Sequence, residues 1–288
     1  MSNPISDLMT DQVKKGHVLA IVLASYFIIL LDTSIVITGL PEIRDAFDLS
    51  RTQLSWVQNA YTLSFGGFLL LGARAGDLLG RKRMFMLGLS LFTLSSLVIG
   101  LATNATTLFV ARAVQGIGAA VLAPSTLALL SIYFAEGKER TKALSYYAAT
   151  AGVGASLGLV AGGVFAGLLS WRVGFLVNVP VGIVLLIAGH KVLQETEKHV
   201  GDFDLIGAVT STVGMTLLVF GIVESASLGW DNIVTIASML IAIFLLSVFF
   251  RHERKALQPI LPLRLFSSRE RVGAYIARML FLGAMVSF

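Results

Sequence analysis

The sequence predicts an all-α membrane protein whose chain crosses a lipid bilayer many times. Hydrophobic residues make up 56% of its 288 residues and charged residues only 14%, compared with about 25% charged residues in a typical soluble domain. Its long apolar runs match the roughly 20 residues that a helix needs to span the hydrocarbon core. Most of the 22 Lys and Arg residues fall in alternate connections between these runs, as they do in cytoplasmic loops. We therefore expect a multi-pass protein of the cell membrane with a cytoplasmic N-terminus.

Eight complete apolar runs and the start of a ninth define the expected helices. They are His17–Leu40, Gln53–Leu71, Met84–Ala102, Thr107–Leu130, Ala143–Leu169, Val173–Val192, Leu205–Val223, Ile233–Phe250 and the run from Val272 to Phe288. The ninth run is still apolar at Phe288, whereas a membrane-spanning helix normally leaves the bilayer through a polar segment. The sequence thus predicts a chain that is cut short within a span.

Composition also limits the kinds of chemistry. The chain has no cysteine and four scattered histidines, a pattern that does not predict a metal site. The net charge of +5 is explained by the orientation of the helices in the membrane, so nucleic-acid binding is not expected. No nucleophile with a neighbouring base is evident. We expect neither an enzyme nor a bound cofactor.

A charged insert separates the second and third apolar runs, from Leu71 to Arg83. An insert this short joins two antiparallel helices at one membrane face, and its four cations indicate the cytoplasmic face. The order of Gly76, Asp77, Gly80 and Arg81 is more specific than that of a generic positively charged loop, the simpler alternative.

This insert resembles the signature loop G-x-L-x-D-R-x-G-R-[KR] of the major facilitator superfamily, with Ala73 at the first glycine position. The resemblance implies a cytoplasmic gate formed by Gly76, Asp77, Gly80, Arg81 and Lys82. Asp77 would pair with Arg81 and face a helix N-terminus of a second lobe.

Four polar residues are predicted at one depth inside the spans. At about 1.5 Å per residue, Arg112 lies about 9 Å and Asp32 about 12 Å below the external edge, and Asn59 lies near 9 Å. Gln115 follows Arg112 by three residues on the same helix face. An arginine inside a span is costly unless it is paired or hydrated, although it can also extend its side chain to the interface. The sequence predicts an intramembrane polar layer.

The sequences around these residues resemble those of one transporter group. Arg112 and Gln115 stand in the superfamily's R-x-x-Q-G-x-G-A-A pattern, and Asp32 in the L-D-x-[ST]-I-V pattern of fourteen-span drug:proton antiporters. Because a carboxylate that alternates between burial and hydration can take up and release a proton, we expect Asp32 and Arg112 to couple protons to transport. A purely structural ion pair is the alternative. Tyr26 and Asn178 join Asn59 and Gln115 in the expected substrate cavity, and Asn178 belongs to a segment resembling W-R-x-x-F-x-x-N-x-P.

The fifth apolar run carries a glycine stripe. Gly154, Gly158 and Gly162 recur every four residues and Gly163 follows, a small-residue pattern that lets membrane helices approach closely. A dinucleotide-binding loop would need a preceding strand. The stripe resembles the antiporter motif G-x-x-x-G-P-x-x-G-G, with Leu159 in place of proline.

Together these resemblances imply the N-terminal part of a fourteen-span major facilitator. The expected parts are a cytoplasmic N-terminus (1–16), a six-helix N-lobe (17–192), a linker (193–204), two inserted helices (205–250), a cytoplasmic connector (251–271) and the first helix of a truncated C-lobe (272–288). The implied function is proton-driven export of lipophilic or cationic small molecules by alternating access. The partners would be this substrate, protons, the bilayer and the missing C-lobe. Alternatives are a symporter or facilitator of the same superfamily and a fragment that does not transport.

Overall fold

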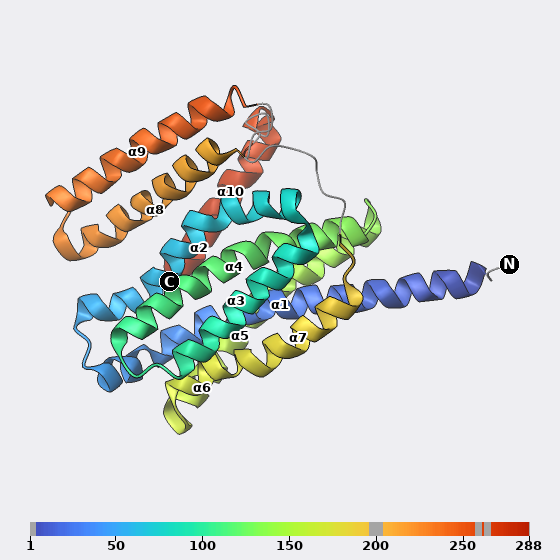
Figure 1. The fold of residues 1–288 in the computed structure, drawn as a ribbon, viewed down its shortest axis with the longest axis horizontal. Helices are drawn as coiled ribbons and strands as arrows, with labels where there is room; N and C mark the ends of the chain where they lie inside the picture. Colours follow the sequence, from blue (N-terminus) through green and yellow to red (C-terminus); the bar gives the residue numbers. More distant parts are fainter. Residues whose placement is uncertain (1–3, 196–203, 257–260, 262–265, 288) are drawn as a thin grey trace.

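The computed structural model describes residues 4–195, 204–256, 261 and 266–287, and within these ranges the regular structure is helical. The helices are α1 (Pro4–Phe47), α2 (Arg51–Leu79), α3 (Arg81–Gly100), α4 (Ala105–Tyr133), α5 (Lys138–Leu168), α6 (Trp171–Leu176), α7 (Asn178–Val192), α8 (Leu205–Leu228), α9 (Ile233–Glu253) and α10 (Arg269–Ser287). Helices α1 to α7 form one bundle, and the α8–α9 hairpin lies beside α2 (Figure 1).

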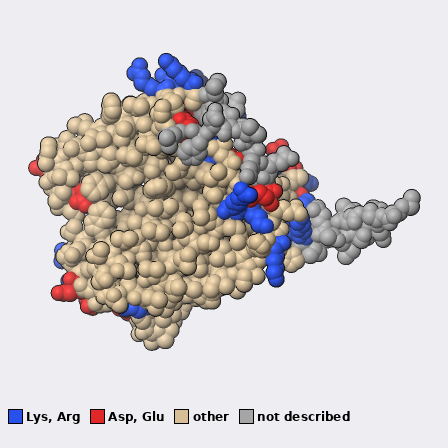
Figure 2. All heavy atoms as spheres, in the orientation of Figure 1, with Lys and Arg blue, Asp and Glu red and all other residues tan. Residues whose placement is uncertain are grey.

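Seven stretches of the described chain are long and apolar enough to cross a membrane. They are Lys14–Phe47, Arg81–Gly100, Ala105–Tyr133, Lys138–Leu168, Trp171–Val192, Ile206–Leu228 and Ile233–Glu253. Helix α2, which was expected to span, does not belong to this set because polar residues such as Gln58 and Asn59 dilute its apolar run. In the face shown in Figure 2, charged side chains gather at the ends of the molecule and leave a broad uncharged band between them, as expected of a surface in contact with lipid.

The bundle buries two apolar layers. The first contains Phe85, Phe92 and Leu129, and the second contains Val57, Ile99 and Trp171. Between these layers along the helices lie buried polar residues, which are described below. Helix α4 packs against α2 and α3, and α1 packs against α5 and α7. Helices α1, α2, α3, α4, α5 and α7 therefore surround the core of the bundle.

The expected loop between the second and third helices is much shorter than predicted. Helix α2 continues to Leu79 and α3 begins at Arg81, so that Gly80 alone interrupts the helix. Gly80 has a φ of 107°, in the region that glycine adopts without steric cost. The charged residues suggested a loop, but they lie within the two helices. A single glycine is enough to reverse the chain between them.

Helix α1 is longer at both ends than the predicted span. Part of the polar N-terminal segment, from Pro4 onward, is helical, and the helix continues past Pro41 to Phe47 instead of ending at Leu40. Proline costs a helix one hydrogen bond. Ile43, beyond the proline, is completely buried in the second apolar layer, and this packing holds the helix together.

The predicted sixth span is one apolar stretch, Trp171–Val192, in which Val177 separates two helices. Helix α6 begins at Trp171, where the Ser170 side chain caps it, and α7 begins after Val177. Pro180 in the first turn of α7 has no N–H, so it cannot donate a hydrogen bond to the preceding turn. The break places Asn178 at the start of α7.

Three further helix ends differ from the prediction. Helix α5 begins at Lys138, α8 extends to Leu228 and α9 to Glu253, so the polar connections at these points are shorter than expected. Most of the predicted linker (193–204) and part of the connector (251–271) lie outside the described residues. Helix α8 packs against α2, where the rings of Trp56 and Phe220 have centroids 6.2 Å apart.

Candidate functional site

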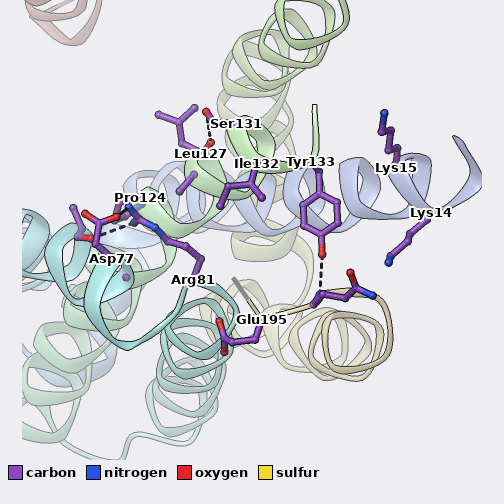
Figure 3. Close-up of a pocket in the computed structure, with 14 residues that line it drawn as sticks. Lys14, Lys15, Asp77, Arg81, Pro124, Leu127, Ser131, Ile132, Tyr133 and Glu195 are labelled. Atoms are coloured by element: carbon purple, nitrogen blue, oxygen red, sulfur yellow. Dashed lines mark hydrogen bonds and ion pairs between the residues drawn. The ribbon is translucent and has the colours of Figure 1, made fainter. Parts of the chain in front are cut away.

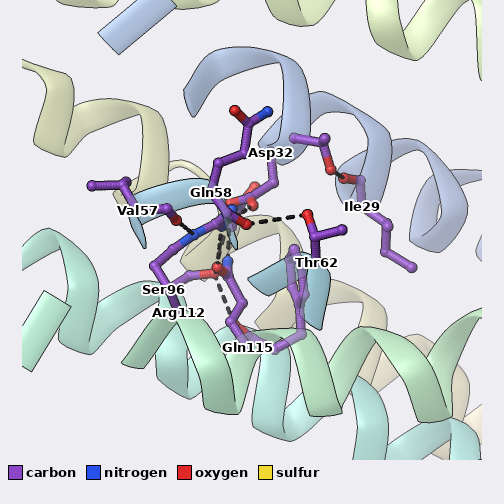
Figure 4. A network of polar contacts seen from close by, with 11 residues as sticks. Ile29, Asp32, Val57, Gln58, Thr62, Ser96, Arg112 and Gln115 are labelled. Carbon is purple, nitrogen blue, oxygen red and sulfur yellow. Dashed lines mark hydrogen bonds and ion pairs between the residues drawn. The ribbon is translucent and has the colours of Figure 1, made fainter. Parts of the chain in front are cut away.

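A buried ion pair lies between the two apolar layers. Arg112 on α4 donates from Nη1 to the Oδ2 atom of Asp32 on α1 over 2.8 Å, and both side chains are 0% exposed. Figure 4 shows the two side chains meeting inside the helix bundle. Because a buried charge without a partner is strongly destabilising, each residue depends on the other in this conformation.

Two amides hold the second carboxylate oxygen of Asp32. Gln115 Nε2 donates to Oδ1 over 2.9 Å, and Asn178 Nδ2 donates to the same atom over 2.7 Å. Gln115 also accepts from Arg112 Nη1 over 2.6 Å. Its Nε2 donates to Ser96 Oγ on α3 over 2.8 Å. The carboxylate thus receives three hydrogen bonds from α4 and α7, which favour its charged form.

The Arg112 guanidinium completes this cluster. Its Nε atom donates to the carbonyl oxygen of Val57 on α2 over 2.9 Å. Its Cζ atom lies 4.4 Å from the ring centroid of Tyr61, a favourable cation–π position. Nη2 has no hydrogen-bond partner among the described residues. We call Asp32, Ser96, Arg112, Gln115 and Asn178 the polar cluster.

The structure brings together most, but not all, of the predicted polar layer. Asp32, Arg112 and Gln115 meet as expected, and Asn178 joins them. Asn59 is partly exposed and makes no hydrogen bond to the cluster within the described chain; α2 contributes the Val57 carbonyl instead. Asn59 was predicted from its depth in the membrane, but depth alone does not determine which way a side chain points around the helix axis.

Tyr26 also lies apart from the polar cluster. Its ring stacks on that of Tyr147 from α5, with centroids 3.9 Å apart and planes inclined by 9°. The Tyr147 hydroxyl lies 3.2 Å from Thr126 Oγ1 on α4. This aromatic pair was not predicted. An aromatic residue in an apolar span carries no sequence signal for its partner.

Ser96 and Tyr61 were also missed by the sequence analysis. Ser96 contacts both amides of the polar cluster, at 2.8 Å from Gln115 and 3.4 Å from Asn178. Serine is common in membrane helices, where it bonds to its own backbone, and Ser96 does so as well at Phe92. Only the three-dimensional arrangement distinguishes it from its neighbours.

At the α2–α3 turn, Asp77 and Arg81 form the predicted ion pair. Arg81 Nη1 also donates to the Ala73 carbonyl over 3.1 Å, and the Lys82 ammonium donates to the His190 carbonyl at the end of α7 over 2.8 Å. Gly76 is buried against the Arg81 side chain. Gly76, Asp77 and Arg81 are therefore in contact, whereas Lys82 contacts the end of α7.

Glu195 is a residue of this turn that the sequence analysis missed. Its carboxylate accepts from the backbone N–H groups of Lys82 and Arg83 over 3.1 and 3.2 Å. It satisfies the first N–H groups of α3, since Gly80 offers no capping side chain. Nothing in the local sequence around Glu195 indicates a partner more than 100 residues earlier.

A cavity of about 970 Å³ opens beside this turn. Asp77, Arg81 and Glu195 lie along one side and Tyr133 on another (Figure 3). Its walls carry both signs of charge, with Lys14 and Lys15 from α1 as further cations. Lys15 is paired with Glu139 at 3.1 Å.

The glycine stripe of α5 lies against α1, as its spacing predicted. Gly154, Gly158 and Gly162 are buried, and a side chain on any of them would meet atoms of α1. Gly163 differs from the prediction because it is exposed and has open space around it. It faces away from α1, about 100° around the helix from Gly162.

Comparison with known proteins agrees with this architecture. Residues 22–288 match the Major Facilitator Superfamily. The chain belongs to this superfamily. Among its relatives, the cephamycin export protein CmcT of Amycolatopsis lactamdurans is 44% identical over 255 residues, covering 86% of this chain and 52% of CmcT. The uncharacterized MFS-type transporter EfpA of Mycobacterium tuberculosis is 40% identical over 257 residues, covering 89% of this chain and 48% of EfpA.

A third relative, the puromycin resistance protein pur8 of Streptomyces alboniger, is 37% identical over 260 residues, covering 90% of this chain and 51% of pur8. The chain thus spans about half the length of these superfamily members. Solved structures share the fold. The peptide transporter POT in complex with sulfate has a TM-score of 0.61 at 14% identity, covering 85% of this chain and 53% of POT. The human organic anion transporter MFSD10 has a TM-score of 0.57 at 16% identity, covering 71% of this chain and 55% of MFSD10.

Proposed function

We propose that this chain belongs to a proton-coupled exporter of lipophilic small molecules, as the N-terminal part of a fourteen-span transporter. The observation that carries the proposal is the ion pair of Asp32 and Arg112, buried inside a membrane bundle. Several relatives have names that refer to export or drug resistance. An intramembrane charge pair is expensive to bury and marks ion pathways in membrane proteins.

Asp32 would carry the proton. In this structure its carboxylate is held by Arg112, Gln115 and Asn178. Protonation removes the negative charge, so Arg112 loses its counter-ion inside the bundle, and the arrangement becomes costly. Opening of the bundle to water would relieve this cost. Because the donors come from α4 and α7, a change at Asp32 would reach both helices at once.

The α2–α3 turn would act as the cytoplasmic gate. Asp77, Arg81 and Lys82 tie α2, α3 and the end of α7 together at one end of the bundle. A gate must open and close many times, and partly exposed ion pairs of this kind are weak enough to be exchanged.

The experiment uses the full-length gene product in inverted membrane vesicles with an imposed proton gradient. We expect lipophilic dyes to be accumulated by the native protein and not by Asp32→Asn, whereas Asp45→Asn on the same helix retains accumulation. Accumulation by Asp32→Asn would contradict proton coupling through Asp32. Accumulation that does not respond to collapse of the gradient would favour a facilitator.

A further inference from the structure

Ser96 is a polar residue of α3 to which the proposed mechanism gives no role. It is 0% exposed, and its hydroxyl donates to the Phe92 carbonyl one turn earlier over 2.8 Å. A hydroxyl has a single proton. Because that proton is engaged with Phe92, the Oγ atom of Ser96 can only accept hydrogen bonds from the other groups around it.

Two amides direct their N–H groups at this oxygen. Gln115 Nε2 donates to Ser96 Oγ over 2.8 Å, and Asn178 Nδ2 lies 3.4 Å from the same atom. The same two nitrogens donate to Asp32 Oδ1 over 2.9 and 2.7 Å. An amide that turned its carbonyl oxygen toward Asp32 would therefore also turn it toward Ser96 Oγ, which has no proton to offer.

As a result, both carboxylate oxygens of Asp32 face hydrogen-bond donors. Oδ1 faces the two amides, and Oδ2 accepts from Arg112 Nη1. An ionised carboxylate only accepts hydrogen bonds, whereas a protonated one also has an O–H to donate. Every hydrogen-bond partner of Asp32 in the described part of the chain is a donor, and a buried O–H without an acceptor costs free energy. This arrangement therefore fits ionised Asp32 and opposes the protonated form.

The two amides differ in what else holds them. Gln115 Oε1 accepts from Arg112 Nη1 over 2.6 Å, and this contact fixes the Gln115 amide independently of Ser96. Asn178 Oδ1 is buried and has no hydrogen-bond partner among the described residues. The orientation of the Asn178 amide is set by the contacts of Nδ2 with Asp32 and Ser96. Asn178 is thus the amide that can offer its carbonyl oxygen to a protonated Asp32 when Ser96 does not oppose the turn.

We propose that Ser96 is a positioning residue that links protonation of Asp32 to the opening of the bundle. Ser96 keeps the Asn178 amide in one orientation, so the proton on Asp32 finds no acceptor until the helices around it move apart. Ser96, Gln115 and Asn178 lie on α3, α4 and α7, so the movement involves three helices. This inference rests on the proposed role of Asp32 as the proton carrier.

Few other groups near Asp32 carry or change charge in the described part of the chain. Arg112 on α4 pairs with Asp32, and the Tyr61 ring on α2 lies 4.4 Å from the Arg112 guanidinium. Helices α3 and α7 contribute the neutral side chains named above, and α5 and α6 pack against the neighbouring turns of α1 with glycines. Arginine and tyrosine do not normally titrate between about pH 5 and 8. A response of this site to pH in that range is therefore assigned to Asp32.

The test is amide hydrogen exchange of the purified full-length gene product in nanodiscs, compared at about pH 5 and 8 after correction for the intrinsic effect of pH. The peptide of interest is 173–182, which contains the break between α6 and α7. We expect faster exchange at the lower pH in the native protein and no such response in Asp32→Asn. Ser96→Ala should reduce the ratio of the two rates by about threefold or more, the effect of one buried hydrogen bond.

A purely structural role of Ser96 would give a different result. Looser packing would raise exchange by the same factor at both pH values and leave their ratio unchanged. Ser96→Thr keeps the hydroxyl and should keep the native ratio. Ser25→Ala is the matched control, because Ser25 is also 0% exposed and donates to the Ile21 carbonyl one turn earlier, away from the polar cluster. It should leave the ratio unchanged.

Circular dichroism and thermal unfolding show whether each variant has folded. If Ser96→Ala does not fold, Ser96→Cys decides, since a thiol is of similar size but a weak acceptor, and it should also reduce the ratio. A native ratio in the folded variant would overturn the proposal. A native protein whose exchange in this peptide does not respond to pH would overturn it as well.

The vesicle experiment tests the export function separately. If exchange follows the expectation and native vesicles show no proton-dependent accumulation, the positioning role of Ser96 stands and the export function fails. If accumulation depends on Asp32 and the folded Ser96 variant keeps the native exchange ratio, the export function stands and the positioning role fails.

Discussion

The described part of the chain contains two pairs of an aspartate with an arginine, and their surroundings differ. Asp32 and Arg112 are 0% exposed and are held by amides and a backbone carbonyl from other helices. In the other pair, the side chains of Asp77 and Arg81 are 35% and 15% exposed, four residues apart around one turn. A buried charge cannot return to water when it loses its partner, whereas an exposed one can. The buried pair of Asp32 and Arg112 therefore suits a structural and coupling role. The pair of Asp77 and Arg81 suits a contact that forms and breaks reversibly.

The largest expected effect is from breaking the buried pair. Arg112→Met should lower the free energy of unfolding by about 3–5 kcal/mol because Asp32 remains buried without its counter-ion. The measurement is unfolding by sodium dodecyl sulfate, followed by circular dichroism. The double variant Asp32→Asn with Arg112→Met should be more stable than Arg112→Met alone. A double variant that is less stable would contradict the view that an uncompensated charge causes the loss.

The contrast between buried and exposed positions can be sharpened with two neighbouring glycines. Gly162→Leu should lower the free energy of unfolding by about 1–3 kcal/mol, since its new side chain would meet Thr38 and Ile35 of α1. Gly163→Leu should change the free energy of unfolding by less than about 1 kcal/mol, because the space around Gly163 is open. The same unfolding titration compares the two variants, and equal losses would show that α5 does not pack through the stripe.

Within the α2–α3 turn, the backbone of Gly80 is expected to matter more than the charges. Gly80→Ala should cost about 1–3 kcal/mol because an L-residue is strained at a φ of 107°, and because the Glu195 carboxylate occupies the place of the new methyl group. Amide hydrogen exchange at Lys82 and Arg83 should become faster as their contact with Glu195 is disturbed. Unchanged exchange and stability would indicate that the turn can rearrange freely.

The smallest effect is expected for the partly exposed pair of Asp77 and Arg81. Asp77→Asn should change the free energy of unfolding by less than about 1 kcal/mol, the usual worth of a surface ion pair. Salt should reduce even this difference between native protein and variant, because exposed charges are screened, while the effect of Arg112→Met should not respond to salt. Unfolding titrations at 50 and 500 mM sodium chloride make this comparison. A large, salt-independent loss for Asp77→Asn would mean that the two pairs are alike.

Much of the fold and part of the site could be predicted from the sequence, because they depend on residue type and spacing. Long apolar runs identify most membrane helices, since water is absent from the bilayer core. An acid and an arginine at similar depth predicted the Asp32–Arg112 pair, because neither could be buried without a partner. The four-residue spacing of Gly154, Gly158 and Gly162 predicted their common face.

The tertiary structure alone decided the directions of side chains and the contacts between distant segments. Depth placed Asn59 in the polar layer, but its rotation around α2 turned it away and left the Val57 carbonyl in contact with Arg112. Glu195 reaches the start of α3 only because α7 returns the chain to that end of the bundle. The stacking of Tyr26 on Tyr147 likewise requires α1 and α5 to pack together. Residue type determines that a buried polar group needs a hydrogen-bond or charge partner. Only the packing of the helices determines which residue is that partner.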